Sequence, residues 1–333
     1  MSKEFIENIW QSKHPLGYLL LPLSWIYTLI IIIRRLAYQS GLIAVNEIDV
    51  PVIIVGNISV GGTGKTPLVV WLAEYFVSKG FKPGIVSRGY GAKLSGKTQQ
   101  VRPDSDPRMV GDEPVLISRK TKCPVAVAVK RRNAAEQLIE HYDCDLILCD
   151  DGLQHYSLAR DIEIAVIDGQ RRFGNEHCLP AGPLREPVSR LESVDFVVSK
   201  YTAKRHEFKM EYSYGDLVSL ADPTQTMPIS NLAGQTVHAI AGIGNPDRYF
   251  SYLRNQKLNI ILHEFQDHHA FTAEDIQFND DVPVVMTEKD AVKCTAFAKK
   301  SHWYLPITAT LPDAFAYRLD VLMKEILNGQ KTA

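Results

Sequence analysis

The chain has 333 residues, of which 45% are hydrophobic and 23% charged, so it can bury a core and is long enough for two domains. This composition excludes a disordered or fibrous chain. The 37 Lys and Arg residues almost balance the 38 Asp and Glu residues, so no overall positive field attracts nucleic acid and we expect no such partner. The five cysteines show neither a C-x-x-C pair nor a zinc spacing, which predicts reduced thiols without a disulfide.

An apolar segment at residues 17–33 carries no charge and is followed by Arg34 and Arg35. It is shorter than the ~20 residues that a spanning helix needs and contains Pro22, so a transmembrane span and a helix lying in the interface both stay open. A signal peptide is not favoured, because no small-residue cleavage site follows, and a buried core helix is the remaining alternative. Basic flanks and several aromatic side chains favour an N-terminal membrane-associated helix, which we place in residues 1–36.

A glycine-rich loop joins an apolar run at residues 51–55 to a helical pattern that begins at Leu68. This strand, loop and helix order is typical of a P-loop, in which backbone N–H groups surround phosphate oxygens, a lysine reaches the β- and γ-phosphates and a hydroxyl ligates Mg²⁺. The usual pattern has glycine where this chain has Ser59, a departure that affects only the first turn of the loop. A chance Gly-rich turn is the alternative. We predict a nucleoside triphosphate site in which Lys65 is catalytic and which consists of Ser59, Val60, Gly61, Gly62, Thr63, Gly64, Lys65 and Thr66.

Apolar runs alternate with helical patterns as far as about residue 205. Runs without polar alternation suit strands that are covered on both faces, as in a parallel sheet. We therefore predict an α/β, P-loop NTPase-type core at residues 37–205, with a mostly parallel sheet and helices on both faces. Residues 93–105 are polar and are expected to form a mobile loop. The predicted strands are 51–55, 83–91, 124–129, 145–151, 162–167 and 196–199, and the predicted helices are 68–79, 111–120 and 133–141.

A second, smaller α/β domain is predicted at residues 206–308, and we expect it to close the cleft of the core. Its predicted strands are 237–244 and 284–287, and its predicted helices are 246–255 and 290–299. The last residues, 309–333, contain a helical pattern that we expect to return to the core.

Two carboxylates end the apolar run that begins at Leu146, namely Asp150 and Asp151. This is the form of a Walker B strand, in which an acidic residue at the carboxyl end holds Mg²⁺ beside the phosphate loop. Taken alone, such a strand is as often a solvated strand end. Together with the P-loop it predicts a Mg²⁺ site with Thr66, Asp150 and Asp151 as ligands.

Further short motifs surround these two. They are S-R-G-Y-G at 87–91, G-D-E-P at 111–114, D-D-G-L-Q-H at 150–155, P-A-G-P-L-R-E at 180–186, F-Q-D-H-H at 265–269 and T-E-K-D-A at 287–291. With the loop at 56–67, they resemble the tetraacyldisaccharide 4'-kinase family of lipid A biosynthesis, from the apolar N-terminal segment to about residue 295. This family also has serine at the position of Ser59.

The resemblance implies a lipid kinase that uses ATP and Mg²⁺. Such an enzyme transfers the γ-phosphate of ATP to the 4'-hydroxyl of a tetra-acylated glucosamine disaccharide 1-phosphate and so forms lipid IVA. It also implies a location at the membrane surface, on the cytoplasmic face of the bacterial inner membrane. No obligate protein partner is expected.

The resemblance assigns the proton of the sugar hydroxyl to a carboxylate–histidine pair, here Asp112 and His268, whose pKa suits proton transfer near neutral pH. The neighbouring His269 is the alternative imidazole, and Asp112 alone would also suit a helix N-cap. Because the pair is separated by about 156 positions, we expect it to form only when the smaller domain closes over the phosphate loop. We add Glu113 to the candidate metal ligands.

Six side chains match family positions around the active-site cleft, and their types suit an anionic amphiphile, with guanidinium groups for phosphates and amide or imidazole groups for sugar hydroxyls. Each of them would equally suit a surface salt bridge. They are Arg88, Tyr90, Gln154, His155, Arg185 and Glu186.

The competing interpretation is a P-loop GTPase or ATPase that acts as a maturation or delivery switch and transfers phosphate only to water. Lys289 directly precedes Asp290, so the Asn-Lys-x-Asp spacing of guanine-reading loops is missing. This segment follows a strand and is expected to contact the nucleotide or the domain interface. The missing spacing and the apolar run at 17–33 favour the kinase.

Overall fold

A computed structural model of the chain describes residues 9–10, 14–89 and 98–329. The contacts divide the chain into two compact units. Unit 1 comprises residues 1–88, 130–211 and 310–333, and unit 2 comprises residues 89–129 and 212–309. Each unit is therefore assembled from segments that are not continuous in the sequence.

The sheet of unit 1 carries the two nucleotide-site motifs on neighbouring strands. Strand β1 (Val52–Gly56) pairs in parallel with β5 (Leu146–Asp150) on one side and with β6 (Ile162–Asp168) on the other. Strand β2 (Pro83–Ser87) continues the sheet beyond β5, and β7 (Phe196–Lys200) and β8 (Phe208–Tyr214) continue it beyond β6, all in parallel. Every residue of β1, β2 and β5 is buried, as expected for strands covered on both faces.

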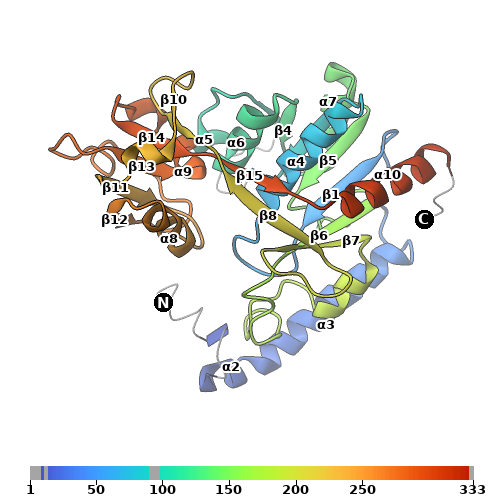
Figure 1. The fold of residues 1–333 in the computed structure, drawn as a ribbon. Helices are drawn as coiled ribbons and strands as arrows, with labels where there is room; N and C mark the ends of the chain where they lie inside the picture. Colours follow the sequence, from blue (N-terminus) through green and yellow to red (C-terminus); the bar gives the residue numbers. More distant parts are fainter. Residues whose placement is uncertain (1–8, 11–13, 90–97, 330–333) are drawn as a thin grey trace. The chain divides into compact units, whose positions relative to one another are not determined.

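Helices cover this sheet. Helix α4 (Lys65–Ser78) packs against β1, β2 and β5, and α7 (Arg131–Tyr142) packs against β2 (Figure 1). The C-terminal helix α10 (Asp313–Leu327) belongs to the same unit and is tied to α4, where the Tyr75 hydroxyl donates to Asp320 at 2.7 Å. A short 3₁₀ helix spans Val188–Ser193. Helix α10 is thus tied to a helix of unit 1.

Two N-terminal helices, α2 (Pro15–Leu19) and α3 (Leu21–Gln39), precede the sheet of unit 1. Helix α3 is the one helix of the described residues that is long and apolar enough to cross a membrane by length and composition. Almost none of its residues is buried, which excludes the alternative of a buried core helix.

Unit 2 contains a second sheet of its own. Strands β11 (Thr236–Ala241), β12 (Asn259–Glu264), β13 (Val284–Thr287) and β14 (His302–Leu305) pair in parallel in the order β14-β13-β11-β12. Beyond β14, the short strands β9 (Leu217–Ser219) and β10 (Thr226–Met227) add antiparallel pairs. Helix α8 (Asp247–Asn255) packs against β12, and α9 (Glu288–Cys294) packs against β13 and β14. The remaining short elements are the 3₁₀ helices Ile229–Leu232 and Thr295–Phe297 and strand β15 (Ile307–Thr310).

Residues 89–129, which lie between the two motifs of the nucleotide site in the sequence, also belong to unit 2. They contain the hairpin of β3 (Gln99–Val101) and β4 (Val125–Val127), the short helix α5 (Pro107–Val110) and α6 (Asp112–Thr121). Helix α6 packs against α9, which comes from the far end of the unit.

The α/β class with a mostly parallel sheet and an N-terminal apolar helix is confirmed. Residues 99–101, expected within a mobile loop, form a strand because they pair with β4. The helix expected over 290–299 begins earlier, because the Thr287 hydroxyl caps it, and ends at Cys294. Contacts place residues 89–129 with unit 2, whereas our boundaries placed them with the core. The closing of the smaller domain over the core stays a prediction.

Candidate active site

The phosphate loop lies between β1 and α4, as its sequence predicts. Gly61 and Gly64 have φ of 106° and 95°, a left-handed backbone that side chains rarely adopt and that turns successive N–H groups toward one side. A Cβ added at Gly61 or Gly62 would meet no heavy atom within 4 Å, so the space above the loop is open. Lys65 and Thr66 form the first turn of α4, where helix N–H groups favour an anion. This geometry suits the phosphates of a nucleotide.

The segment at residues 180–186 supports the first turn of the loop. The Val60 N–H donates to Pro183 O at 2.8 Å, and the Arg185 N–H donates to Ile58 O at 2.7 Å. Ser59 is nearly buried and forms a bridge with Leu184, so its environment is that of an extended strand. This pairing explains how serine replaces the glycine of the general motif.

The acidic pair ends β5 directly beside β1. Val55 is opposite Asp150 in the parallel register, so the carboxylates follow at the edge of the sheet where the phosphate loop begins. Arg131, buried in the first turn of α7, donates to the backbone oxygens of Asp150 and Asp151 at 3.2 and 2.6 Å. The Ser87 hydroxyl lies 3.4 Å from Oδ2 of Asp150. The strand end is therefore held from two neighbouring elements.

These residues fit a magnesium ion. Mg²⁺ prefers hard oxygen ligands and keeps several waters and phosphate oxygens, so a P-loop needs few protein ligands. The Thr66 hydroxyl and the Asp150 carboxylate supply such oxygens from the two adjacent motifs. Within the described residues, no group of three or more His, Cys, Asp or Glu side chains could hold a metal by itself. Glu113 accepts a hydrogen bond from Lys289 at 3.0 Å, and its assignment as a ligand stays a prediction.

Asp151 is surrounded by positive charge. Its Oδ1 lies 3.3 Å from Nζ of Lys65, and Arg185 donates to both of its oxygens at 3.1 Å. Burial alone would raise the pKa of Asp151, but Lys65 and Arg185 lower it to about 2. Asp151 is thus ionised at neutral pH and holds the lysine of the phosphate loop and the arginine of the 180–186 segment together.

Two of the six predicted substrate side chains support the site from within. The Gln154 amide donates to Asn57 O at 3.0 Å and to Oε1 of Glu186 at 2.7 Å, so both of its hydrogens are engaged. Glu186 is only 1% exposed and also accepts from the Tyr156 hydroxyl and lies 3.5 Å from Nε of Arg190. Direct contact of Glu186 with a substrate does not agree with this burial, because its oxygens serve buried partners.

Three further side chains were predicted to bind the substrate. Two of them lie near the edge of the sheet that carries the nucleotide site, and one lies outside the described residues. Arg88 is exposed and directly follows β2. His155 is half-buried with Nε2 3.2 Å from the Ser157 hydroxyl, and burial together with nearby arginines lowers its pKa to about 4, so it is neutral at pH 7. Tyr90 lies outside the described residues. The substrate roles of all three stay predictions.

We expect Glu186→Ala to lower the free energy of unfolding by about 3 kcal/mol, because it leaves the buried Tyr156 hydroxyl without its acceptor and removes a carboxylate that faces the buried Arg190. Glu186→Gln keeps one acceptor oxygen and should cost clearly less. Urea denaturation of the three proteins followed by circular dichroism measures both effects. Equal stability of the alanine variant and the parent would contradict the role of Glu186 as a buried hydrogen-bond acceptor.

The predicted carboxylate–histidine pair exists, and it lies within unit 2. Nδ1 of His268 is 3.0 Å from Oδ2 of Asp112, which is the first residue of α6. Oδ1 of Asp112 accepts a hydrogen bond from the Glu113 N–H at 2.9 Å. His269 instead contacts Asp275 at 3.1 Å. Our expectation that the pair needs closure of one domain over the other is wrong, since residues 89–129 and 212–309 form one unit.

The charges of the pair define which imidazole nitrogen is protonated. Burial would raise the pKa of Asp112, but the hydrogen bond from His268 and the charge of Lys289 lower it to about 2. An ionised carboxylate only accepts hydrogen bonds, so Nδ1 of His268 must carry the hydrogen and donate it. The hydrogen bond to Asp112 raises the pKa of His268 above its ordinary value, while burial and Lys289 oppose this. In the neutral imidazole, Nε2 is then the basic nitrogen.

Several residues of the site were not found from the sequence. Asn57 is fully buried and donates to the Thr63 hydroxyl at 3.1 Å, which braces the phosphate loop. Arg131 and Arg190 are buried arginines, and only the tertiary structure shows that they are not surface residues. Lys289 was noted for its motif, but the sequence contained no signal for its partners.

Three comparisons relate the chain to known proteins. A family model described as tetraacyldisaccharide-1-P 4'-kinase matches residues 16–324. A tetraacyldisaccharide 4'-kinase from Nitrosococcus oceani is 49% identical over 320 residues, which cover 96% of this chain and 94% of that protein. The corresponding protein from Hahella chejuensis is 44% identical over 334 residues, which cover 98% of each. The crystal structure of LpxK from Aquifex aeolicus in complex with ATP superposes with a TM-score of 0.80 and 28% identity, and covers 93% of this chain and 99% of that one.

Proposed function

The chain belongs to the tetraacyldisaccharide-1-P 4'-kinase family, and on this basis we propose that it transfers the γ-phosphate of ATP to the 4'-hydroxyl of tetraacyldisaccharide 1-phosphate. The product is lipid IVA, and the reaction belongs to lipid A biosynthesis. The observation that carries the proposal is a phosphate loop with its acidic strand in a chain that also holds a hydrogen-bonded Asp112–His268 pair. Such a pair suits an acceptor hydroxyl, whose proton must be removed as its oxygen attacks the phosphorus.

Unit 1 would bind the nucleotide. The N–H groups of the loop from Ser59 to Thr66 surround the phosphates, and Lys65 moves from Asp151 to the β- and γ-oxygens. Thr66 and Asp150 would hold Mg²⁺, with Asp151 beside them. A Mg²⁺ ion held there would supply positive charge against the negative charge that develops on the phosphates during transfer. Arg185 remains next to Asp151, where its guanidinium suits a phosphate of either substrate.

Unit 2 would supply the base. Asp112 keeps Nδ1 of His268 protonated and orients the ring. Nε2 then accepts the proton of the 4'-hydroxyl as its oxygen attacks the γ-phosphorus, while the bond from this phosphorus to the bridging oxygen of the β-phosphate breaks and ADP leaves. The imidazolium that forms is stabilised by the Asp112 carboxylate. His269 is engaged with Asp275, and we therefore assign the role to His268.

Incubation of the purified protein with γ-labelled ATP, Mg²⁺ and tetraacyldisaccharide 1-phosphate in detergent tests this function. We expect the label in a lipid product, and no product when the lipid or the metal is omitted. Label released only as inorganic phosphate, at the same rate with and without lipid, would overturn the kinase and favour the hydrolytic switch.

We further propose that the kinase works on a membrane surface, the cytoplasmic face of the inner membrane, and that α3 lies in the plane of this surface. One side of α3 is held by hydrogen bonds to later residues of unit 1. The hydroxyl of Ser24 donates to Cys178 O at 2.7 Å, and the hydroxyl of Tyr27 donates to Arg185 O at 3.1 Å. The Arg35 guanidinium donates to the Ser193 hydroxyl at 2.8 Å. This attachment along the helix favours a position in the plane of the surface over a transmembrane span. The remaining sides expose large apolar residues, which suit the interface.

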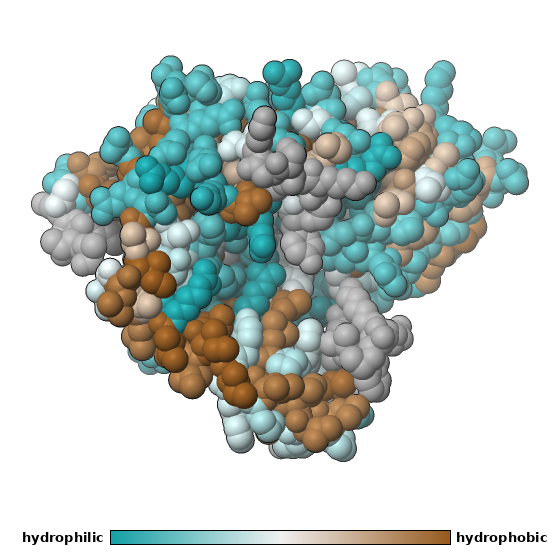
Figure 2. Space-filling model, turned by 180° about the vertical axis from the view of Figure 1, so that it is seen from behind, coloured by the Kyte–Doolittle hydropathy of each residue, from teal (hydrophilic) through white to brown (hydrophobic). Residues whose placement is uncertain are grey.

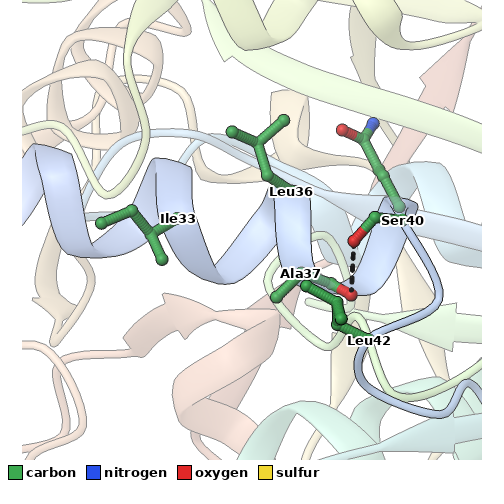
Figure 3. A pocket seen from close by; sticks show the side chains of 6 residues that line it. Ile33, Leu36, Ala37, Ser40 and Leu42 are labelled. Carbon is green, nitrogen blue, oxygen red and sulfur yellow. Dashed lines mark hydrogen bonds between the residues drawn. The ribbon is translucent and has the colours of Figure 1, made fainter.

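The apolar surface continues past the end of α3. Figure 2 shows a hydrophobic band where α2 and α3 lie. At the C-terminal end of α3, Ile33 and Leu36 form an apolar pocket with Leu42 of the following turn (Figure 3), and Leu42 is 83% exposed. Contact with lipid chains would cover these side chains. The same α3 supports Arg185 through Tyr27, so the membrane-facing element is joined to the catalytic unit.

Replacing Ile26 and Ile30 together by aspartate should weaken binding to vesicles about 100-fold, because two exposed isoleucines lose their burial in lipid. The KM for lipid in vesicles should rise, while kcat in detergent stays within about twofold. Tyr317→Asp with Val321→Asp is the matched control, since it adds the same charge at the same spacing on α10. Flotation with vesicles measures binding. Equal flotation of both variants would contradict the orientation of α3.

A further inference from the structure

The T-E-K-D-A motif at residues 287–291, which the sequence predicted only as a contact of the nucleotide or the domain interface, has a defined local structure. It forms the first turn of α9 in unit 2. Asp290 is fully buried, and its Oδ2 accepts from the Thr287 hydroxyl at 2.6 Å and from the Gly242 N–H at 2.8 Å. Glu288 pairs with Lys120 at 2.9 Å. The hydrogen bonds of the buried Asp290 fix the turn, so the backbone of Lys289 has a defined position.

The side chain of Lys289 points into a group of three carboxylates. Its Nζ is 3.0 Å from Oε1 of Glu113, 3.2 Å from Oδ1 of Asp267 and 3.9 Å from Oδ2 of Asp112. The side chain is only 18% exposed, so these interactions are less screened than those of a surface lysine. Lys289 thus bears one positive charge among three negative ones.

These carboxylates belong to the two segments that form the Asp112–His268 pair. Asp112 and Glu113 are the first two residues of α6, and Asp267 directly precedes His268. Without a cation, Asp267 and the α6 carboxylates would repel each other, and the two segments would separate. Because the pair is a single hydrogen bond of 3.0 Å, a small separation would break it.

The backbone of His268 adds a second reason. Its φ is 63°, in the left-handed region that non-glycine residues adopt at a cost. Such a conformation persists where neighbouring contacts impose it. Lys289 holds Asp267 on one side of His268, and Asp275 holds His269 on the other. Loss of the Lys289 contact would let the imidazole rotate away from Asp112.

We propose that Lys289 is a positioning residue for phosphate transfer: its charge holds α6 and the 265–269 segment together and so places the imidazole of His268 against Asp112. It acts through this pair and does not contact the reacting atoms. The proposal rests on the proposed function, in which the pair accepts the proton of the lipid hydroxyl.

Kinetics of Lys289→Met test the role, because methionine keeps an unbranched side chain that is shorter by one heavy atom and removes the charge. We expect kcat to fall about 30-fold, as for other residues that orient a catalytic group, and the KM for ATP to stay within about threefold. Lys289→Arg should recover most of kcat. Lys120→Met is the matched control. The Lys120 side chain is 17% exposed, lies in the same unit and pairs with the carboxylate of Glu288. The kcat of Lys120→Met should stay within about threefold of the parent.

A charge-balanced variant separates positioning from general stability. Lys289→Met combined with Asp267→Asn removes one cation and one anion. The kcat of this double variant should therefore be about tenfold higher than that of Lys289→Met. In protein with ¹⁵N-labelled histidine, the Hδ1 resonance of His268 reports the hydrogen bond to Asp112. This signal should be lost in Lys289→Met and retained in Lys120→Met.

Unchanged kcat and an unchanged Hδ1 resonance in Lys289→Met would overturn the proposal, and so would an equal loss of kcat in Lys120→Met. If the parent protein forms no phosphorylated lipid, the proposed function fails instead. The Hδ1 resonance would still decide whether Lys289 holds the pair.

Discussion

Lys65→Ala will reduce phosphate transfer to lipid by about 10³-fold, the largest effect that we expect from a single substitution. Lys65 is the first residue of α4, and its side chain is 11% exposed beside the Asp151 carboxylate. In the reaction its charge would shift to the β- and γ-phosphate oxygens, where negative charge grows as the bond to the leaving group breaks. Alanine removes this charge and leaves the backbone of the loop in place.

The measurement is the initial rate with labelled ATP and lipid in detergent, together with the dissociation constant for ATP. Most of the loss should appear in kcat, because the contact strengthens in the transition state. Lys79→Ala is the control from the opposite end of the same helix, where Lys79 pairs with Asp320 on the surface, and it should leave kcat unchanged. Turnover of Lys65→Ala near the parent rate would contradict the assignment of the phosphate loop.

Asp112→Ala and His268→Ala will each lower kcat by about 10²- to 10³-fold, and the double variant will be little worse than either single one. The two side chains share one hydrogen bond of 3.0 Å, so removal of either partner disables the same step. Groups that act as one unit are non-additive, whereas independent groups would multiply their losses. The KM for ATP should change little.

Kinetics of the four proteins at saturating ATP and lipid give the coupling between the two positions. His269→Ala is the control, because this imidazole contacts Asp275 and not Asp112. Its kcat should stay within about threefold of the parent. Multiplicative losses at Asp112 and His268 would show that they act separately, and full activity of His268→Ala would transfer the role to another base.

Much of unit 1 could be predicted from the sequence because its signals are local. Strands β1 and β5 are unbroken apolar runs, and the phosphate loop is recognised within twelve consecutive residues. Short strands were missed because they carry too little local signal. Strands β9 and β14 have four residues or fewer, and they depend on pairing with neighbouring strands.

The order of helices and strands along the sequence did not predict which segments belong to which unit. Residues 89–129 continue the alternating series of apolar runs and helical patterns after β2, interrupted only by the polar residues 93–105, and we therefore expected them in the core. The packing of α6 against α9 groups them with unit 2. This contact joins segments more than 160 positions apart, and no local pattern indicates which of several apolar helix faces will meet.

By itself, the sequence determined the chemistry that this protein can perform: a phosphate loop with Lys65 and Thr66, an acidic strand end at Asp150, and an apolar helix near the N-terminus. Each depends on residue types at short spacing, which local hydrogen bonding and hydrophobic periodicity constrain. Only the tertiary structure decided which charged side chains are partners. Glu186 became a buried acceptor and Lys289 the cation of three carboxylates, because the energy of a charge depends on its burial and on the charges within a few ångströms, and chain topology sets both.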